Sequence, residues 1–352
     1  MSRPKKRLLI LVGVLLSMLF LGYSLRGTDF GAIGGALADA NWWLCAPMLA
    51  AYALYYWIKA IRWRLLLQPM TRTTARAIFK PMMIGFLFNN LLPAHLGELV
   101  RMYLGARQLR LRKTQVLATI VLERMFDFLS VVFFLGLVLI VGKDIPASLV
   151  SLGYATAAGG LGFLAIAAVY IRWTPGFLGA LRALTLFVPR LARLRGLAWL
   201  ARAREGAFHQ LEVGVEGLYA LKNPRLLAGV VATSLAQWAC MGVSAYLAMR
   251  AVRLETRMSA AFVVLAATTF GVTLPAAPGF LGTIQAAFKV ALLPYGVSAT
   301  AAFAASAFFH VPTYLAVTLP GLYLLRRTGY RLRQIQQEAE AAAGEAADDR
   351  SD

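Results

Sequence analysis

The chain has 352 residues, 59% of them hydrophobic and 15% charged, and a formal net charge of +20 at pH 7. A soluble domain is nearer half apolar and a quarter charged, so these proportions predict a membrane protein. The basic residues cluster in short connections between apolar runs, which is typical of cytoplasmic loops beside anionic lipid and argues against nucleic-acid binding. The HExxH, CxxC and GxxxxGK(S/T) motifs do not occur, so neither a metal nor a cofactor is expected.

Six apolar runs are long enough to cross a bilayer, which predicts an all-α, polytopic membrane protein with about six full spans. Basic residues precede the first run and follow the last, so both the N- and C-termini are expected in the cytoplasm. In the second span, Arg62 and Arg64 are expected at the inner membrane interface. In chain order the spans are Leu8–Leu25, Trp42–Leu67, Gln115–Val141, Ser148–Ile171, Leu226–Met249 and Thr300–Leu325.

Two regions, 81–100 and 258–294, contain apolar runs that are too short to span and are expected to form re-entrant helical hairpins. As a helix, Pro81–Leu92 would cover ~18 Å, against the ~30 Å of the hydrocarbon core. Basic residues flank this run on both sides, so it is expected to enter from the cytoplasm, turn and return. Region 258–294 is interrupted at Pro275–Gly282 and is expected to re-enter from the outer side.

The two interruptions share the sequence Pro-x-x-Leu-Gly, at Pro93–Gly97 and at Pro278–Gly282. A five-residue match is weak by itself, but these two matches fall at corresponding places in the two halves of the chain. Hairpins that enter from opposite sides are typical of an inverted repeat, in which broken helices build a substrate site near the bilayer midplane.

The rest of the chain completes a membrane domain over residues 1–333. Region 172–225 is predicted to be a basic cytoplasmic loop with an amphipathic helix, in which Leu191, Leu194, Leu197 and Leu200 repeat at helical spacing. That helix either lies on the anionic inner leaflet or packs on the protein's own cytoplasmic face. Residues 334–352 are acidic and Ala-rich, which predicts a disordered tail. Small residues in the spans, such as Gly153–Gly162, permit close helix contacts and a homo-oligomer.

Three groups of polar and helix-breaking residues are candidates for binding a substrate. Free backbone N–H groups at a broken helix favour an anion such as a phosphate, and charges inside a membrane are usually functional. The first group is Asn89, Asn90, Pro93, Gly97, Glu98 and Arg101; the second is Glu123, Arg124 and Asp127; the third is Pro278, Gly279, Gly282, Gln285 and Lys289.

Each group also has a structural interpretation that the sequence leaves open. The first group fits a tight cytoplasmic turn, in which Glu98 and Arg101 pair with each other at i, i+3 spacing. The second fits a buried network that fastens two helices. In the third, Lys289 reaches back to the outer surface. Nearby, His310 is more often a packed and hydrogen-bonded histidine than a proton carrier.

Three runs in these regions resemble the transmembrane, flippase-like domain of lysylphosphatidylglycerol synthases and their stand-alone relatives. They are NNLLPAHLGELVR (Asn89–Arg101), VLERMFD (Val121–Asp127) and PAAPGFLG (Pro275–Gly282), and the similarity covers about residues 8–325. The resemblance implies a bacterial or archaeal inner-membrane protein that moves or handles a polar-headed lipid. The family often has Glu where this chain has Gln285, so the role of that acid is not carried over.

The resemblance further implies that bifunctional members carry a soluble aminoacyltransferase domain after the membrane domain. Only about 27 residues follow Leu325, so synthase activity is not expected, and we predict a protein that is not an enzyme. The expected localisation is the bacterial inner (cytoplasmic) membrane.

The residues and the resemblance together predict an integral inner-membrane lipid translocase. A phosphate-bearing headgroup would lie between the two hairpins, held by Arg101 and Arg124. Glu98, Glu123 and Asp127 are the candidate proton carriers, because no ATPase motif is present. The expected partners are membrane lipids with phosphate headgroups and the anionic inner leaflet.

Two alternatives remain open. One is a non-transporting accessory protein that binds a lipid or a biosynthetic enzyme through loop 172–225. The other is an intramembrane glycosyl- or acyltransferase, for which His95 and Glu98 form the candidate acid–base pair.

Overall fold

The structure is a computed structural model that describes residues 3–92, 96–141, 174–185, 223–273 and 277–328, with a few positions between 146 and 162 and Arg204. For residues 3–11 only the backbone is described. These parts of the chain are helical and contain no strand, as predicted. The leucine repeat predicted within 172–225 and the tail at 334–352 lie outside the described residues, as does most of the fourth predicted span. One helix, α8 (Thr174–Leu184), is described in loop 172–225.

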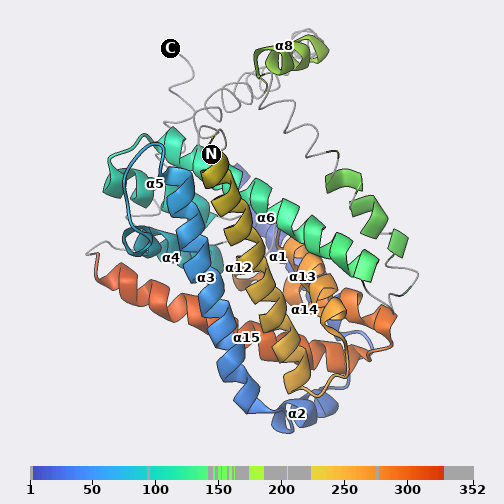
Figure 1. Ribbon diagram of the computed structural model, residues 1–352. Coiled ribbons are helices and arrows are strands. Elements are labelled where there is room, and N and C mark those ends of the chain that lie inside the picture. Colours follow the sequence, from blue (N-terminus) through green and yellow to red (C-terminus); the bar gives the residue numbers. More distant parts are fainter. Residues whose placement is uncertain are drawn as a thin grey trace.

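Four helices of the described chain are long and apolar enough to cross a membrane, and they confirm four of the predicted spans. The second of these four is the 29-residue α6, which would measure ~43 Å and exceeds the ~30 Å hydrocarbon core. Figure 1 shows α3 and α12 side by side along most of their length. The four are α3 (Cys45–Leu67, preceded by the 3-10 turn η1, Trp42–Leu44), α6 (Lys113–Val141), α12 (Pro224–Ala251) and α15 (Ala299–Arg326).

Helix ends follow local capping chemistry. The Asn223 side chain accepts hydrogen bonds from two backbone N–H groups at the start of α12, where Pro224 occupies the first turn. Ser298 caps α15 in the same way. The predicted outer loop between the first two spans contains a short helix that we did not expect, α2 (Phe30–Ala38), whose first N–H groups are bound by Asp29.

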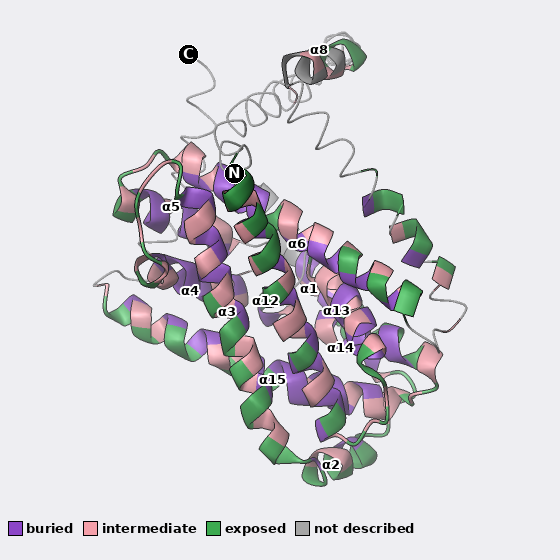
Figure 2. Cartoon of the chain, in the orientation of Figure 1, coloured by how far each residue is buried: buried purple, intermediate pink, exposed green. Residues whose placement is uncertain are grey.

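Polarity is distributed as expected for a protein surrounded by lipid. Large apolar side chains are exposed on the outward faces of α1 (Arg3–Leu25), α6 and α15, among them Leu19, Ile140 and Leu319. Five charged side chains of α3, α5 and α6 are instead buried: Lys59, Arg62, Arg101, Glu123 and Asp127. Figure 2 shows the buried residues on the inward faces of the helices and exposed residues outside. The molecule is therefore a multi-pass membrane protein with a charged interior.

The first predicted hairpin is a close pair of helices, α4 (Ala75–Leu91) and α5 (Leu96–Leu109). The helix α4 begins before Pro81, earlier than expected, and α5 continues beyond the predicted end at residue 100. Gly85 and Gly97 meet where the two helices touch: a Cβ on Gly97 would lie 1.9 Å from the Gly85 carbonyl oxygen. Any larger residue at position 97 would therefore push the two helices apart.

The second predicted interruption also breaks a helix. After α13 (Met258–Thr273), the chain forms the 3-10 turn η2 (Pro278–Phe280) and then α14 (Thr283–Leu292). Gly279 and Gly282 have φ values of 75° and 81°, a left-handed conformation that side chains with a Cβ rarely adopt. The two breaks come together in space, because a Cβ on Gly279 would lie 3.8 Å from the Asn90 carbonyl oxygen.

Candidate functional site

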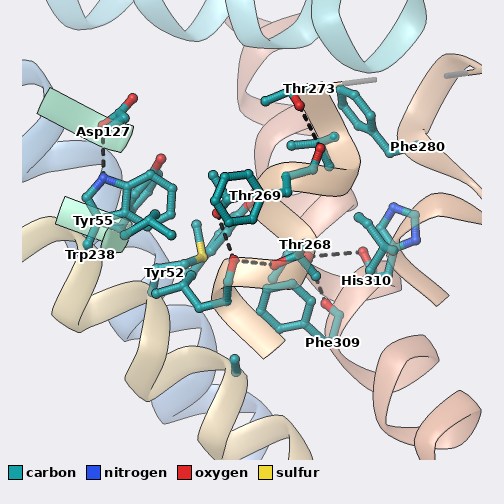
Figure 3. Close-up of a pocket in the computed structure, with 18 of the residues that line it drawn as sticks. Tyr52, Tyr55, Asp127, Trp238, Thr268, Thr269, Thr273, Phe280, Phe309 and His310 are labelled. Carbon is teal, nitrogen blue, oxygen red and sulfur yellow. Dashed lines mark hydrogen bonds between the residues drawn. The ribbon is translucent and has the colours of Figure 1, made fainter. Parts of the chain in front are cut away.

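A cavity of about 450 Å³ lies at the centre of the helices, and Figure 3 shows part of its wall. Side chains from α3, α4, α5, α6, α12, α13, α14 and α15 line it, together with Phe280 of η2. Most of the lining is aromatic or aliphatic, and polar side chains form two separate groups within it. The cavity thus has the mixed lining that is usual for a site that holds a small organic ligand.

One polar group gathers at the junction of α4, α5 and α6 and contains Asn89, Asn90, Glu98, Arg124 and Asp127. The Arg124 Nε atom lies 3.0 Å from the Glu98 carboxylate, which forms an ion pair with the guanidinium. Its Nη1 atom lies 3.6 Å from the Asp127 carboxylate. The Arg124 side chain is nevertheless 45% exposed, so this cation borders the cavity with part of its surface uncovered.

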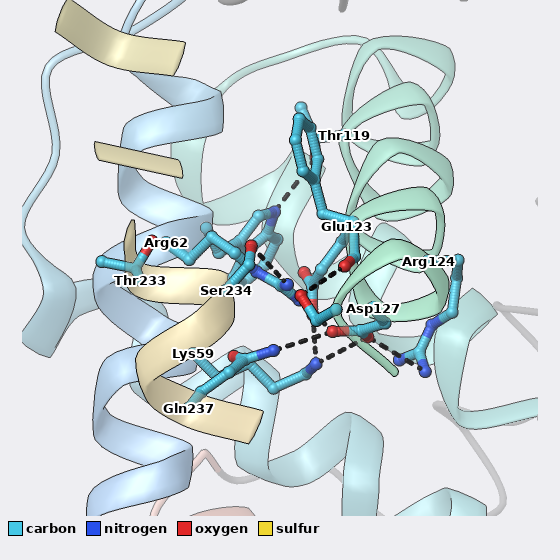
Figure 4. Close-up of polar contacts among 12 residues, drawn as sticks. Lys59, Arg62, Thr119, Glu123, Arg124, Asp127, Thr233, Ser234 and Gln237 are labelled. Atoms are coloured by element: carbon cyan, nitrogen blue, oxygen red, sulfur yellow. Dashed lines mark hydrogen bonds and ion pairs between the residues drawn. The ribbon is translucent and has the colours of Figure 1, made fainter. Parts of the chain in front are cut away.

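Asp127 is the centre of a buried hydrogen-bond network behind this group (Figure 4). Its Oδ1 accepts bonds from Arg62 of α3 at 2.8 Å, and from Gln237 and Trp238 of α12 at 2.7 and 2.9 Å. Its Oδ2 accepts from Lys59 of α3 at 3.0 Å. One carboxylate therefore joins three helices, which compensates the cost of burying it.

Glu123, one turn before Asp127, forms the second centre of the network. Its carboxylate pairs with Arg101 of α5 at 2.5 Å, Lys59 at 2.9 Å and Arg62 at 3.3 Å. The Arg101 guanidinium also stacks on the Trp63 ring, with 3.8 Å to the ring centroid. Arg101 and Glu123 are both buried and do not border the cavity.

The second polar group lies near the break between α13 and α14, where His310 borders the cavity and Gln285 does not. His310 of α15 has its Nδ1 atom 3.1 Å from the Gln285 side-chain nitrogen. The Gln285 side-chain oxygen in turn accepts the N–H of Gly282 at 2.8 Å. The backbone of Gly279 forms a hydrogen bond with His310 as well. This chain of bonds holds the turn at residues 279–282 against α15, so Gln285 and His310 position the broken helix.

Aromatic and hydroxyl side chains complete the lining. The rings of Tyr52, Tyr55 and Tyr56 of α3 lie in mutual contact, with centroid distances between 5.0 and 6.1 Å. On the facing side, Thr268 and Thr269 of α13 donate their hydroxyl protons to backbone carbonyls and keep oxygen lone pairs available to accept.

The structure brings together some predicted site residues and separates others. The cavity is lined by five of the predicted site residues, Asn89, Asn90, Glu98, Arg124 and Asp127. Helix packing brings these five together. Lys289 lies away from it: its amine donates to the backbone oxygens of Tyr23 at 2.8 Å and Arg26 at 2.5 Å, at the end of α1.

The remaining predicted residues have structural positions. Gly97 fits against α4, Gly282 packs against the α1 backbone, and Gly279 packs against Tyr314. Pro278 starts the turn η2, and Pro93 lies outside the described residues. The alternative in which Glu98 pairs with Arg101 at i, i+3 spacing is wrong, because Glu98 contacts Arg124 and Arg101 contacts Glu123.

The sequence-based prediction missed Lys59 and Arg62, which provide two of the buried cations. Arg62 was expected at the inner membrane interface; the structure shows that its side chain is fully buried in the protein and bound by acids of α6, while its depth in the membrane stays a prediction. The signal in the sequence was the position of Lys59, eight residues inside the end of an apolar span, where a charge needs a partner. Gln237 and Trp238 carried no such signal.

The fold and the site define a class: a multi-pass helical membrane protein with a charged, buried network beside a central cavity. Among the described residues, no group of three or more His, Cys, Asp or Glu side chains is arranged to hold a metal ion. The chain belongs to the family described as "Lysylphosphatidylglycerol synthase TM region", which matches residues 10–321. This confirms the family that the sequence motifs predicted.

A curated relative is a protein named "Glycosyltransferase AglD" from Haloferax volcanii, which is 26% identical to this chain over 342 residues. The match covers 91% of this chain and 54% of the relative, so the chain spans about half the length of that protein. The prediction that this protein is not an enzyme is contradicted by this finding, because the relative is named as an enzyme. No solved structure matches the chain.

Proposed function

We propose that this protein binds a lipid with a phosphate-bearing headgroup in the central cavity and moves it between the two leaflets of the membrane. The observation that supports this most directly is the position of Arg124. Its partly uncovered guanidinium borders a largely apolar cavity inside a membrane protein. Guanidinium groups bind phosphate oxygens well, and an aromatic and aliphatic lining accommodates the adjoining chain.

The surroundings of Arg124 support the same assignment. Asn89 and Asn90 lie at the polar end of the cavity with Arg124, and the Asn89 side-chain oxygen is buried without a hydrogen-bond partner in the protein. The Asn90 amide donates to Thr318 at 3.1 Å. An Asn amide nitrogen can donate to a phosphate oxygen, and an Asn amide oxygen can accept from a headgroup hydroxyl. Transport would be downhill or coupled to an ion, with the partly exposed Glu98 as the proton carrier.

The test is lipid exchange between leaflets in reconstituted liposomes. Arg124→Gln should reduce the rate about ten-fold or more, because a charge-assisted hydrogen bond to the phosphate is lost. Arg124→Lys keeps the charge but loses the planar guanidinium, so its exchange rate should lie between the rates of wild type and Arg124→Gln. Arg76→Gln, on the exposed surface of α4, serves as the control. Equal rates for wild type and Arg124→Gln would refute the proposal.

A second candidate function is the transfer of a sugar to or from a lipid held in the same cavity. The name of the Haloferax volcanii relative supports it, as do Glu98 and Asp127, the two carboxylates that line the cavity. The purified protein would be incubated with lipid-linked and nucleotide-linked sugars and lipid acceptors, and products identified by mass spectrometry. A glycolipid formed by wild type and lost in Glu98→Gln would support this function. The absence of any product would count against it.

We also propose that the α4–α5 and α13–α14 pairs are re-entrant hairpins in a bacterial inner membrane, with both chain termini in the cytoplasm. The pairs have shorter helices than the four long spans, of 17 and 14 residues and of 16 and 10 residues. Single cysteines would be introduced at Arg76 and Arg110, in a background without Cys45 and Cys240. A membrane-impermeant thiol reagent should reach both positions from the same side. Labelling from opposite sides would make the α4–α5 pair two ordinary crossings.

A further inference from the structure

Arg124 already has an anion next to it, the carboxylate of Glu98. Both side chains line the cavity, and the Glu98 side chain is 28% exposed. The Glu98 oxygen lies 3.0 Å from the Arg124 Nε atom, which is the distance at which a phosphate oxygen would bind the same group. Glu98 therefore occupies part of the space that a headgroup phosphate needs. The inference drawn from this rests on the proposed binding of phosphate by Arg124.

The two acids near Arg124 differ in how firmly they are held. Asp127 accepts four hydrogen bonds from two other helices, α3 and α12, and is nearly inaccessible, so releasing it would leave Lys59 and Arg62 without this acceptor. Among the described residues, the ion-pair partner of Glu98 is Arg124. A partly exposed pair of this kind is weak, whereas a buried and multiply bonded one is not. Glu98 is thus the acid that an incoming phosphate can displace.

The location of Glu98 in its helix makes displacement tolerable. It lies in the first turn of α5, where the helix dipole favours a negative charge. The partial exposure of its side chain also lets water replace the guanidinium. The neighbouring pair of Arg101 and Glu123 is buried and keeps α5 attached to α6 while Glu98 changes partner.

The charge of the whole cluster indicates which headgroups it accepts. The cluster holds four cations, Lys59, Arg62, Arg101 and Arg124, and three acids, Glu98, Glu123 and Asp127, so four minus three leaves one positive charge. An uncompensated charge inside a membrane is costly. A phosphodiester with one negative charge cancels it. A zwitterionic headgroup brings no net charge and leaves the cluster positive.

We propose that Glu98 holds the place of the substrate phosphate on Arg124, and that the cavity selects lipids with one net negative charge over zwitterionic lipids. When the lipid binds, its phosphate replaces the Glu98 carboxylate as the ion-pair partner of Arg124. The Glu98 side chain then rotates towards solvent or towards the hydroxyl groups of the headgroup. Glu98 is then a competitor that weakens lipid binding and lets the lipid leave again.

The experiment measures binding of short-chain lipids to the full-length protein in detergent by isothermal titration calorimetry. The probes are dihexanoyl phosphatidylglycerol, dihexanoyl phosphatidylcholine and glycerol phosphate. The variants are Glu98→Gln, Glu98→Ala and Arg124→Gln, and the exposed Glu255→Gln is the matched control for loss of an acid. The melting temperature of each variant verifies that it is folded. Two different substitutions of Glu98 are used so that a change in binding can be assigned to the loss of the carboxylate and not to the side chain introduced.

Wild type should bind phosphatidylglycerol more tightly than phosphatidylcholine, and should not bind glycerol phosphate measurably. Both Glu98 variants should bind phosphatidylglycerol about two- to five-fold more tightly than wild type, because a partly exposed ion pair no longer competes. Glu255→Gln should match wild type.

Four results would overturn the inference or its basis. Equal or weaker binding by both Glu98 variants would refute the competitor role, and equal affinity for the two lipids would refute the charge selection. Glycerol phosphate binding as tightly as the lipid would make this an anion site without a lipid requirement. Undiminished binding by Arg124→Gln would instead refute the proposed function, which separates the two failures.

Discussion

Asp127→Asn is the substitution for which the structure predicts the largest loss of stability. Asparagine keeps the shape of the side chain but removes its charge, and it turns one acceptor oxygen into an N–H donor. The carboxylate now receives four hydrogen bonds, from Lys59, Arg62, Gln237 and Trp238, at 2.7 to 3.0 Å. In the variant, at least one of these donors faces another donor inside the protein.

The magnitude follows from the buried charges. Five of them are almost inaccessible, Lys59, Arg62, Arg101, Glu123 and Asp127, and three cations against two acids leave a charge of +1. Removing the Asp127 carboxylate raises this to +2. Breaking a buried pair by removing one partner costs about 3–5 kcal/mol. That loss corresponds to a melting temperature lower by on the order of 10 °C.

Thermal unfolding of the detergent-purified protein, followed by tryptophan fluorescence, measures this loss. Asp39→Asn, on the exposed surface, is the matched control and should melt like wild type. Adding Lys59→Met to Asp127→Asn returns the buried charge to +1, so the double variant should recover about 1–3 kcal/mol relative to additivity. The reasoning fails if Asp127→Asn melts with the control, or if the double variant shows the sum of the two single losses.

Two further substitutions test the packing of the broken helices. Gly97→Ala places a Cβ 1.9 Å from the Gly85 oxygen and should cost about 1–3 kcal/mol in the same unfolding assay. The control is Gly35→Ala, which should cost little because no atom lies within 4 Å of the added Cβ. Equal melting temperatures for the two variants would contradict the close contact of α4 and α5. Lys289→Met removes the amine that donates to the Tyr23 and Arg26 carbonyls and should cost about 1.5–3 kcal/mol of stability. The control is Arg76→Met, at an exposed position. Unchanged stability of Lys289→Met would mean that this contact does not hold α1.

The helix breaks were predictable because their signals are local. Proline and glycine at 278–282 disfavour a continuous helix whatever surrounds them, and the structure breaks there with left-handed glycines. The length of apolar runs likewise predicted the four long helices, including the stretch Trp42–Leu67 that η1 and α3 form together. In contrast, α2 was missed because its nine residues are too few to produce a clear periodic pattern.

The partners of the charged residues were not predictable in the same way. Spacing along a helix suggested that Glu98 pairs with Arg101, but both side chains contact α6. Lys59 meets Asp127 across 68 positions of sequence, and Asn90 meets Thr318 across 228. A one-dimensional pattern contains the neighbours three or four residues away on the same helix, and it does not contain the facing helix.

By itself, the sequence determined the membrane class, the lengths of the long helices and the places where helices break. It also showed which charged residues lie within apolar segments and therefore require partners. Only the tertiary structure decided which of them meet. It placed Asp127 and Glu123 among Lys59, Arg62 and Arg101 in a buried network, and left Arg124 and Glu98 at the cavity. The physical reason is that apolar length and backbone conformation are local properties, whereas the burial of a charge is stable only with partners that other helices supply.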